Sequence, residues 1–445
     1  MKKKNNKLKQ EQRIFISKYS KRSYNKSELL SISKKTLHSS AESIKEQNMA
    51  GKKGKNEEEH KILLGRPGNN LKSGIVGLAN VGKSTFFQAI TRSPLGNPAN
   101  YPFATIDPEE ARVIVPSPRL DKLFKLYKPP KKVPAYITVY DIAGLTKGAS
   151  KGEGLGNAFL SNIRAVDAIY QVVRCFKDPE ITHIEGDVDP VRDLEIISNE
   201  LRLKDIDFAT KYLENVQKTA ERGGQSLEVK AAKEEVKIAQ KVIDLLKEGK
   251  RVANQKWDVK EVEVINKMLM LTAKPCIYLI NLSERDYIRK RNKWLPKIKE
   301  WVDTNSPGDT IIPLSICLEE RLSHIETDAD REAEEEKIGA HSALPKIILA
   351  MRKLLHLISF FTAGETDEVR EWTIREGTKA PQAAGVIHTD LMKTFILANV
   401  MSFSDLDELG SESAVRAAGK LMQKGKDYVV QDGDVIYFKA TAGKS

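Results

Sequence analysis

The chain has 445 residues, of which 40% are hydrophobic and 30% are charged, and its net charge is +12. This length suffices for two or three domains, and the composition excludes a wholly disordered chain. No apolar run approaches the ~20 residues of a membrane helix, and the three cysteines are far apart and lack a C-x-x-C pair. The sequence therefore predicts no membrane span, no disulfide framework and a reducing compartment such as the cytoplasm.

The positive charge is concentrated at the N-terminus. The first 48 residues hold 13 Lys and Arg against 4 Glu and no Asp, which accounts for +9 of the total. This segment is rich in Ser, Asn and Gln, a composition that does not offset the entropy cost of folding. We expect residues 1–64 to form a disordered basic extension. RNA contact and a targeting peptide are the functional alternatives, although targeting segments favour Arg over Lys and lack acidic residues.

From Asn70 onward, strand patterns and helix patterns alternate. A short β run over residues 72–77 precedes a glycine-rich turn and a helical pattern over 84–91. Further apolar runs predict buried strands at 111–115, 136–142, 168–173, 275–280 and 310–314. This alternation predicts an α/β fold with a doubly wound sheet, whose ligand lies at the carboxyl ends of the strands. We assign residues 65–195 and 263–360 to this domain.

Residues 196–262 interrupt the alternation with a long, charged helical pattern. Apolar residues line one helix face before the Gly223-Gly224 breaker and another face after it. We expect two antiparallel helices that form a projecting arm. A plain helical hairpin packed on the core explains the same pattern.

Residues 361–445 are predicted to form a small α+β domain. Its expected elements are a strand at 372–374, a helix at 389–400, and a hairpin that pairs 427–431 with 435–439 across the Asp432-Gly433 turn.

The strongest local signal is G-L-A-N-V-G-K-S, Gly77 to Ser84, which satisfies G-x-x-x-x-G-K-[ST] between a strand and a helix. The glycines let successive backbone N–H groups point at phosphate oxygens, and the helix N-terminus adds positive potential. We expect Lys83 to bind the β- and γ-phosphates, the Ser84 hydroxyl to bind Mg²⁺, and Thr85 to reach the α-phosphate. A glycine-containing turn that binds nothing is the alternative.

A second motif, D-I-A-G, begins at Asp141, at the end of a predicted strand. A carboxylate there can hold Mg²⁺ through water, and Gly144 can present its N–H to the γ-phosphate. Between the two motifs, Thr105 can complete the magnesium shell.

Two positions differ from an ordinary GTPase. The base-recognition string N-K-x-D is N-L-S-E here, from Asn281 to Glu284. The longer carboxylate and the missing Lys predict weak guanine selectivity, whereas Asn281 and the backbone of Leu282 can face an adenine amino group. Leu145 replaces the glutamine that positions water, so hydrolysis should be slow or rely on another residue. A GTPase or dual-specificity enzyme stays open, as does a ribosome- or RNA-binding module with ATP as a structural ligand.

Taken together, residues 65–440 resemble the Obg-like ATPases of the YchF type. The matching strings are G-L-A-N-V-G-K-S-T-F-F, N-Y-P-F-A-T-I-D-P, D-I-A-G-L-T-K-G-A-S-K-G-E-G-L-G-N, I-T-H-I-E-G-D-V-D-P, N-L-S-E-R-D-Y and G-T-K-A-P-Q-A-A-G-V-I-H-T-D. The resemblance implies a P-loop domain with an inserted coiled-coil arm and a C-terminal TGS domain of β-grasp type. It also implies ATP hydrolysis with Mg²⁺, a potassium-like ion as a stimulant, and association with ribosomes. We expect a monomer.

The resemblance also implies roles for individual residues. Ser84 and Thr105 hold the metal, Asn281 and Leu282 contact adenine, and Ser315 is a weaker candidate beside the base. His183, in I-T-H-I-E-G, takes over from the missing glutamine, with a structural histidine bonded to a loop as the alternative. The phosphate-binding residues implied in this way are Asn80, Val81, Gly82, Lys83, Ser84 and Thr85.

Overall fold

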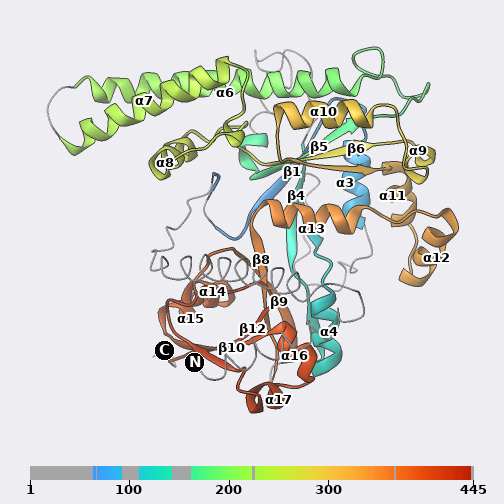
Figure 1. Ribbon diagram of the computed structural model, residues 1–445, viewed down its shortest axis with the longest axis vertical. Coiled ribbons are helices and arrows are strands. Elements are labelled where there is room, and N and C mark those ends of the chain that lie inside the picture. Colours follow the sequence, from blue (N-terminus) through green and yellow to red (C-terminus); the bar gives the residue numbers. More distant parts are fainter. Residues whose placement is uncertain are drawn as a thin grey trace, which may run out of the picture. The chain divides into compact units, whose positions relative to one another are not determined.

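The computed structural model of the protein describes residues 64–66, 68–92, 110–142, 162–222, 226–364 and 367–441 (Figure 1). Apart from Leu64, the predicted basic extension lies outside the described residues. Within the described part, no helix has both the length and the apolar character needed to cross a membrane.

The first sheet has the strand order β2-β4-β1-β5-β6-β7, and all neighbouring strands are parallel except β2 and β4. Each strand boundary lies within one residue of the predicted one, and the predicted α/β class is confirmed. The strands are β1 (Lys72–Val76), β2 (Glu110–Ile114), β4 (Tyr136–Asp141), β5 (Ala168–Arg174), β6 (Cys276–Asn281) and β7 (Thr310–Leu314).

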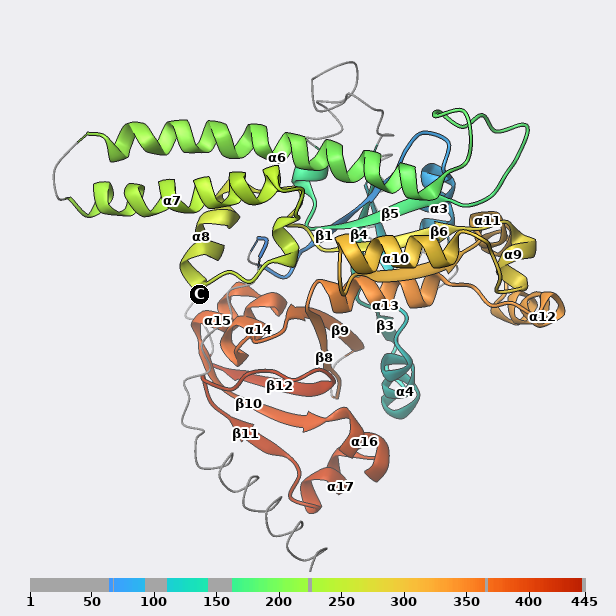
Figure 2. The same ribbon diagram turned by 45° about the horizontal axis from the view of Figure 1, so that its top comes forward.

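Helices cover both faces of this sheet, so every residue of the central strands β5 and β6 is buried. Figures 1 and 2 show α6 and α10 on one face and α3 and α13 on the other. Their apolar side chains share one core with the strands. The helices of this part of the chain are α3 (Lys83–Arg92), α6 (Pro190–Ala220), α7 (Leu227–Lys247), α8 (Val259–Met268), α9 (Glu284–Ile288), α10 (Leu295–Asn305), α11 (Ile316–Ser323), α12 (Asp328–Ile338) and α13 (Leu344–Leu354).

The helices α6 and α7 lie side by side and run antiparallel (Figure 2). The helix α6 begins at Pro190 because the Asp189 carboxylate accepts from the N–H groups of Val191 and Arg192, so the predicted arm boundary at 196 falls inside the helix. The first turns of α6 pack on the sheet, and its middle shares a separate core with α7 and α8. The coiled-coil description of this pair stays a prediction.

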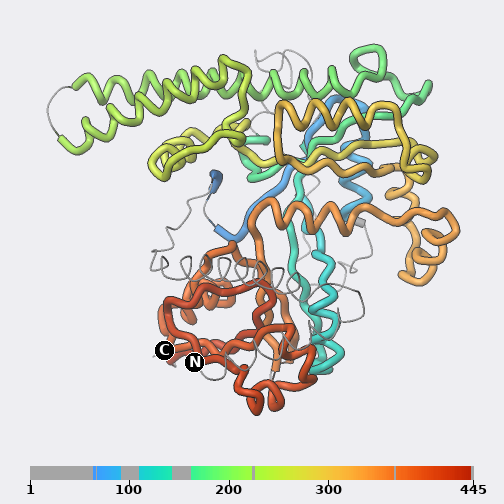
Figure 3. Tube along the Cα trace, in the orientation of Figure 1, coloured from blue at the N-terminus to red at the C-terminus, as the bar shows by residue number. Residues whose placement is uncertain are grey.

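The chain passes directly from α13 into a second sheet, a path that can be followed along the Cα trace of Figure 3. The strand order of this sheet is β11-β10-β12-β8-β9-β3. Its first strand after α13 begins at Leu357, before the predicted domain boundary at 361. One strand, β3, comes from the earlier part of the chain, and α4 (Pro118–Tyr127) shares a core with this sheet. The strands are β3 (Lys131–Val133), β8 (Leu357–Thr362), β9 (Glu368–Arg375), β10 (Phe395–Ser402), β11 (Met422–Lys424) and β12 (Asp434–Ala440). The helices are α14 (Ala380–Ile387), α15 (Thr389–Lys393), α16 (Phe403–Leu409) and α17 (Glu412–Ala417).

Two predictions for this second sheet are wrong. The helix expected at 389–400 ends at Lys393, and β10 follows, because residues 395–402 pair along their length with β12. The expected hairpin is absent from the described residues, since 427–431 form no strand there and β12 pairs with β10 and β8. The Asp432-Gly433 turn is instead hydrogen-bonded to β8. The Gly433 N–H donates to the Ser359 carbonyl, and the Asp432 carboxylate accepts from the Ser359 N–H. The β-grasp assignment stays a prediction.

Candidate nucleotide site

The P-loop connects β1 to α3, and its glycines are needed for close packing. A Cβ on Gly77 would lie 2.7 Å from the Val172 carbonyl oxygen. Gly82 has a φ of +102°, and a Cβ there would lie 2.9 Å from the Asn281 amide nitrogen. Asn80 also has a positive φ, +60°, in the region that Asn tolerates better than most residues. The loop therefore keeps its curvature against the ends of β5 and β6.

Lys83, Ser84 and Asp141 meet at the carboxyl ends of β1 and β4. The Ser84 hydroxyl lies near the Asp141 carboxyl, and the Lys83 ammonium donates to the Leu78 carbonyl at 2.8 Å. Burial lowers the pKa of Lys83 to about 8, although the charge of Asp141 opposes this. Burial likewise raises the pKa of Asp141, against the opposing effects of Ser84 and Lys83. The ends of these two strands thus bring together a cation, a hydroxyl and a carboxylate, the groups that Mg-bound phosphates require.

The remaining phosphate-binding residues extend along the same loop. Val81 is buried, Asn80 is exposed, and Thr85 is half-buried on the first turn of α3. Three predicted residues, Thr105, Gly144 and Leu145, lie outside the described residues.

The residues predicted to recognise the base form hydrogen bonds to backbone groups of the protein itself. The Asn281 side chain donates to the Val81 carbonyl at 3.0 Å and accepts from the Ile316 N–H at 3.1 Å. Both ends of the amide are therefore occupied by backbone groups. The Leu282 N–H donates to the Leu314 carbonyl at 2.8 Å, and the fully buried Ser315 hydroxyl has no hydrogen-bond partner in the described part of the chain.

The Glu284 carboxylate is paired with a cation that sequence reasoning missed. Arg321, on α11, donates to it at 2.8 Å. The carboxylate that replaces the guanine-binding aspartate is thus longer and also partly neutralised, which supports the weak guanine selectivity inferred from the sequence. Arg321 is 37 positions away in the chain, so no local motif indicates the pair.

His183 is buried, and both of its ring nitrogens have partners. Nε2 lies 2.9 Å from an Asp193 carboxylate oxygen, and Nδ1 accepts from the Glu185 N–H at 3.2 Å. The proton therefore belongs on Nε2. This arrangement matches the structural alternative, since neither nitrogen is free to orient water in this conformation. The preceding residue links the segment to the P-loop, because the Asn80 side chain donates to the Thr182 carbonyl at 3.1 Å.

Arg174 is the second residue that sequence reasoning missed. It ends β5, is 1% exposed and donates to the Asn80 carbonyl. Its position in the sequence could have indicated a special role, because it is the only charged residue of the strand A-I-Y-Q-V-V-R and lies at its end.

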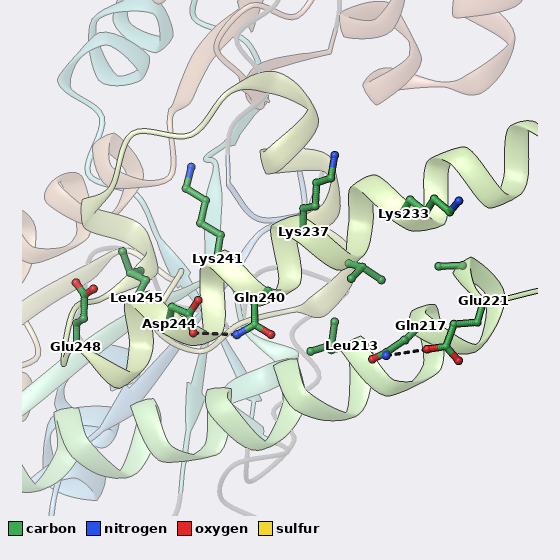
Figure 4. A pocket seen from close by; sticks show the side chains of 12 residues that line it. Leu213, Gln217, Glu221, Lys233, Lys237, Gln240, Lys241, Asp244, Leu245 and Glu248 are labelled. Carbon is green, nitrogen blue, oxygen red and sulfur yellow. Dashed lines mark hydrogen bonds between the residues drawn. The ribbon is translucent and has the colours of Figure 1, made fainter.

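A separate groove of about 1050 Å³ lies between α6 and α7 (Figure 4). Its walls mix apolar residues such as Leu213 and Leu245 with charges of both signs, including Lys237 and Glu221. None of the predicted nucleotide-binding residues lines it, so it belongs to the helical pair and not to the P-loop.

Comparison with known proteins connects this geometry to a family. Residues 72–210 match a family model described as a 50S ribosome-binding GTPase, and residues 357–441 match the C-terminal YchF-GTPase model, described as a protein of unknown function. The chain is 73% identical over 389 residues to Obg-like ATPase 1 of Saccharomyces cerevisiae, covering 87% of this chain and 98% of the relative. It is 53% identical to Obg-like ATPase 1 of Homo sapiens over 379 residues, covering 85% and 94%.

A solved structure agrees with these relatives. The YchF GTPase of Schizosaccharomyces pombe superposes with a TM-score of 0.79 at 59% identity, covering 85% of this chain and all of that one.

Proposed function

The chain belongs to the Obg-like ATPase family, a group of P-loop nucleotide hydrolases, and we propose that it is a slow, Mg²⁺-dependent ATPase that switches state with its nucleotide and acts on ribosomes. The observation that carries the proposal is the meeting of Lys83, Ser84 and Asp141 beside the curved P-loop. The ammonium stabilises phosphate charge, and the hydroxyl and carboxylate supply oxygen ligands for a hard cation.

Magnesium is proposed because the donor set fits it. Mg²⁺ keeps several waters and takes one or two protein oxygens together with phosphate oxygens, and the side chains of Ser84 and Asp141 already lie near each other. When bound, the ion would neutralise charge on the phosphates. A potassium-like ion as a stimulant rests on the family resemblance alone.

ATP is the proposed substrate because the described surroundings of Glu284 do not favour guanine. Its carboxylate is longer than the aspartate of a GTPase and is paired with Arg321. A GTPase or dual-specificity enzyme is the second candidate, since the matched family model and the solved relative are both described as GTPases. Calorimetric titration of one preparation with ATP and GTP separates them: tighter ATP binding is expected, and equal or reversed affinities would contradict the adenine assignment.

We favour a switch over a structural role for ATP because Lys83 lies in the P-loop, where its ammonium donates to the Leu78 carbonyl, and is not part of the apolar core of the domain. Lys83→Ala should therefore give a folded protein that fails in turnover. A structural-ligand role predicts a poorly folded variant instead, which circular dichroism and thermal melting would reveal.

The ribosome is the proposed partner, with the protein acting as a monomer in the cytoplasm. The proposal rests on the family resemblance, and RNA contact through the basic tail, the helical pair and the C-terminal domain would be electrostatic. Co-sedimentation with purified ribosomes at increasing salt tests it. Binding should weaken as salt rises and should differ between ATP and ADP.

A further inference from the structure

Arg174 is a buried cation that bonds to backbone instead of to an acid. In the described part of the chain its hydrogen bonds all go to carbonyl oxygens, and no carboxylate lies within ion-pair distance. Burial lowers the pKa of Arg174, although the charges of Asp178 and Asp193 oppose this effect. Because burial of a charge without a direct ion pair is costly, the hydrogen bonds to backbone must offset that cost.

The guanidinium joins two separate segments. One nitrogen, Nη1, donates to the Asn80 carbonyl of the P-loop at 3.3 Å. The others donate to the segment after β5: Nη2 to the Ile181 carbonyl at 2.9 Å and, more weakly, to Asp178 at 3.4 Å, and Nε to Phe176 at 3.2 Å. The guanidinium carbon also lies 4.7 Å from the centre of the Phe176 ring.

These contacts fix the orientation of a P-loop peptide. In a trans peptide the C=O and N–H bonds point in opposite directions. Holding the Asn80 carbonyl toward Arg174 therefore directs the Val81 N–H away from it. The Asn281 side chain likewise donates to the Val81 carbonyl, so the Gly82 N–H points away from Asn281. Consecutive N–H groups held in this way form an anion-binding nest.

The same side chain ties the P-loop to the segment that carries His183. Arg174 holds Ile181, and the Asn80 side chain adds an independent bond to the Thr182 carbonyl. The residue that follows is His183, so a movement of the P-loop around phosphate would be passed to it.

We propose that Arg174 is a positioning residue that pre-sets the P-loop peptide after Asn80 for phosphate binding and couples nucleotide binding to the 176–183 segment. The coupling rests on the proposed function, because it matters only if nucleotide exchange drives a change of state. Lysine cannot replace the guanidinium, since one ammonium lacks the planar fork that reaches both segments.

The binding test uses Arg174→Met and Arg174→Lys, titrated calorimetrically with ADP and with Mg·ATP. We expect both variants to bind both nucleotides about tenfold more weakly, or ~1.4 kcal/mol. The matched control is Arg251→Met. Arg251 is a half-buried arginine, with its side chain 12% exposed, that donates to a backbone carbonyl, Lys274 at 3.0 Å, and pairs with Asp309. This control should lower the melting temperature and leave affinity unchanged.

Unchanged nucleotide affinity in folded Arg174 variants would overturn the proposal, as would an equal loss of affinity in the Arg251 control. Failure of the wild-type protein to bind ATP would instead contradict the proposed function. The two failures are therefore distinguishable.

A second measurement does not depend on whether the variants fold. Hydrogen exchange of the wild-type protein should show that ADP protects residues 176–183 together with the P-loop. Protection confined to the P-loop would contradict the coupling. If Arg174→Lys folds, it should lose protection in the 176–183 segment and keep part of it in the P-loop.

Discussion

At the residue scale, nucleotide choice depends on what surrounds the Glu284 carboxylate. Leu282→Lys is a poor way to restore a GTPase motif, because Leu282 is 3% exposed and an ammonium there would be buried. We expect Glu284→Asp alone to change GTP affinity little, since Arg321 still neutralises the carboxylate. Glu284→Asp with Arg321→Gln should raise GTP affinity about tenfold, within the range for one polar contact to a base. Parallel titrations with ATP and GTP measure this, and no gain in the double variant would show that Arg321 is irrelevant to selectivity.

His183 presents a second test at this scale. If it takes part in hydrolysis, His183→Ala should lower single-turnover hydrolysis ten- to a thousandfold, roughly the loss for an orienting or acid–base group, with ATP affinity nearly unchanged. Because His183 is bonded to Asp193 at 2.9 Å, Asp193→Asn is the matched comparison. A purely structural pair predicts similar losses of melting temperature and little effect of either variant on turnover. Retained turnover in His183→Ala would assign hydrolysis elsewhere.

The phosphate-binding residues could be predicted because the P-loop motif fixes their spacing. The roles of Arg174 and Arg321 could not, since their partners are backbone carbonyls and a side chain distant in sequence. The bonds of His183 were equally hidden, because Asp193 belongs to a helix whose start the sequence pattern placed too late.

At the element scale, α11 carries a buried acid whose charge is costly. Glu319 accepts from the Ser342 hydroxyl and from the Ala343 N–H at 2.7 Å, and burial, together with Glu335, raises its pKa to about 7. An unfolded glutamate titrates near 4.5, so between these values the folded state binds more protons and stability falls as pH rises.

Glu319→Gln removes this titration and keeps the shape. We expect the variant to match the wild type in free energy of unfolding near pH 5 and to exceed it by about 2 kcal/mol at pH 8, an estimate from the size of the pKa shift. Denaturant unfolding at both pH values measures this difference. A wild-type protein that is the more stable of the two at pH 8 would show that the charged carboxylate contributes favourable bonds.

The two sheets differ in how far sequence pattern predicts them. In the first sheet, strands buried on both faces give continuous apolar runs, and these were located within one residue. In the second sheet, β10 has buried residues at 395, 398 and 401, a spacing of three that also fits one face of an amphipathic helix. Pairing with β12, a long-range contact, decides between them.

At the scale of the whole molecule, the chain is longer than its match to the Saccharomyces cerevisiae relative. The match to the Saccharomyces cerevisiae relative covers 98% of that protein but 87% of this one. The C-terminal matches extend to residue 441, and the first 48 residues carry most of the net charge. The basic segment is therefore the natural candidate for an added electrostatic function.

Deletion of residues 2–48 tests this function. Each lysine or arginine that contacts phosphate releases counterions, so a chain with +9 charges in one segment should bind RNA nonspecifically and with strong salt dependence. The deletion should lower RNA affinity and flatten its dependence on salt, measured by titration of a labelled single-stranded RNA between about 50 and 200 mM salt. ATP turnover should stay nearly unchanged, because every nucleotide-binding residue identified lies after Gly77.

As a control for charge alone, glutamine substitution of the lysines and arginines in residues 2–26 should reproduce most of the effect at full length. A large loss of turnover on deletion would show that the segment reaches the nucleotide site, and unaltered RNA binding would place the RNA contacts in the remaining chain.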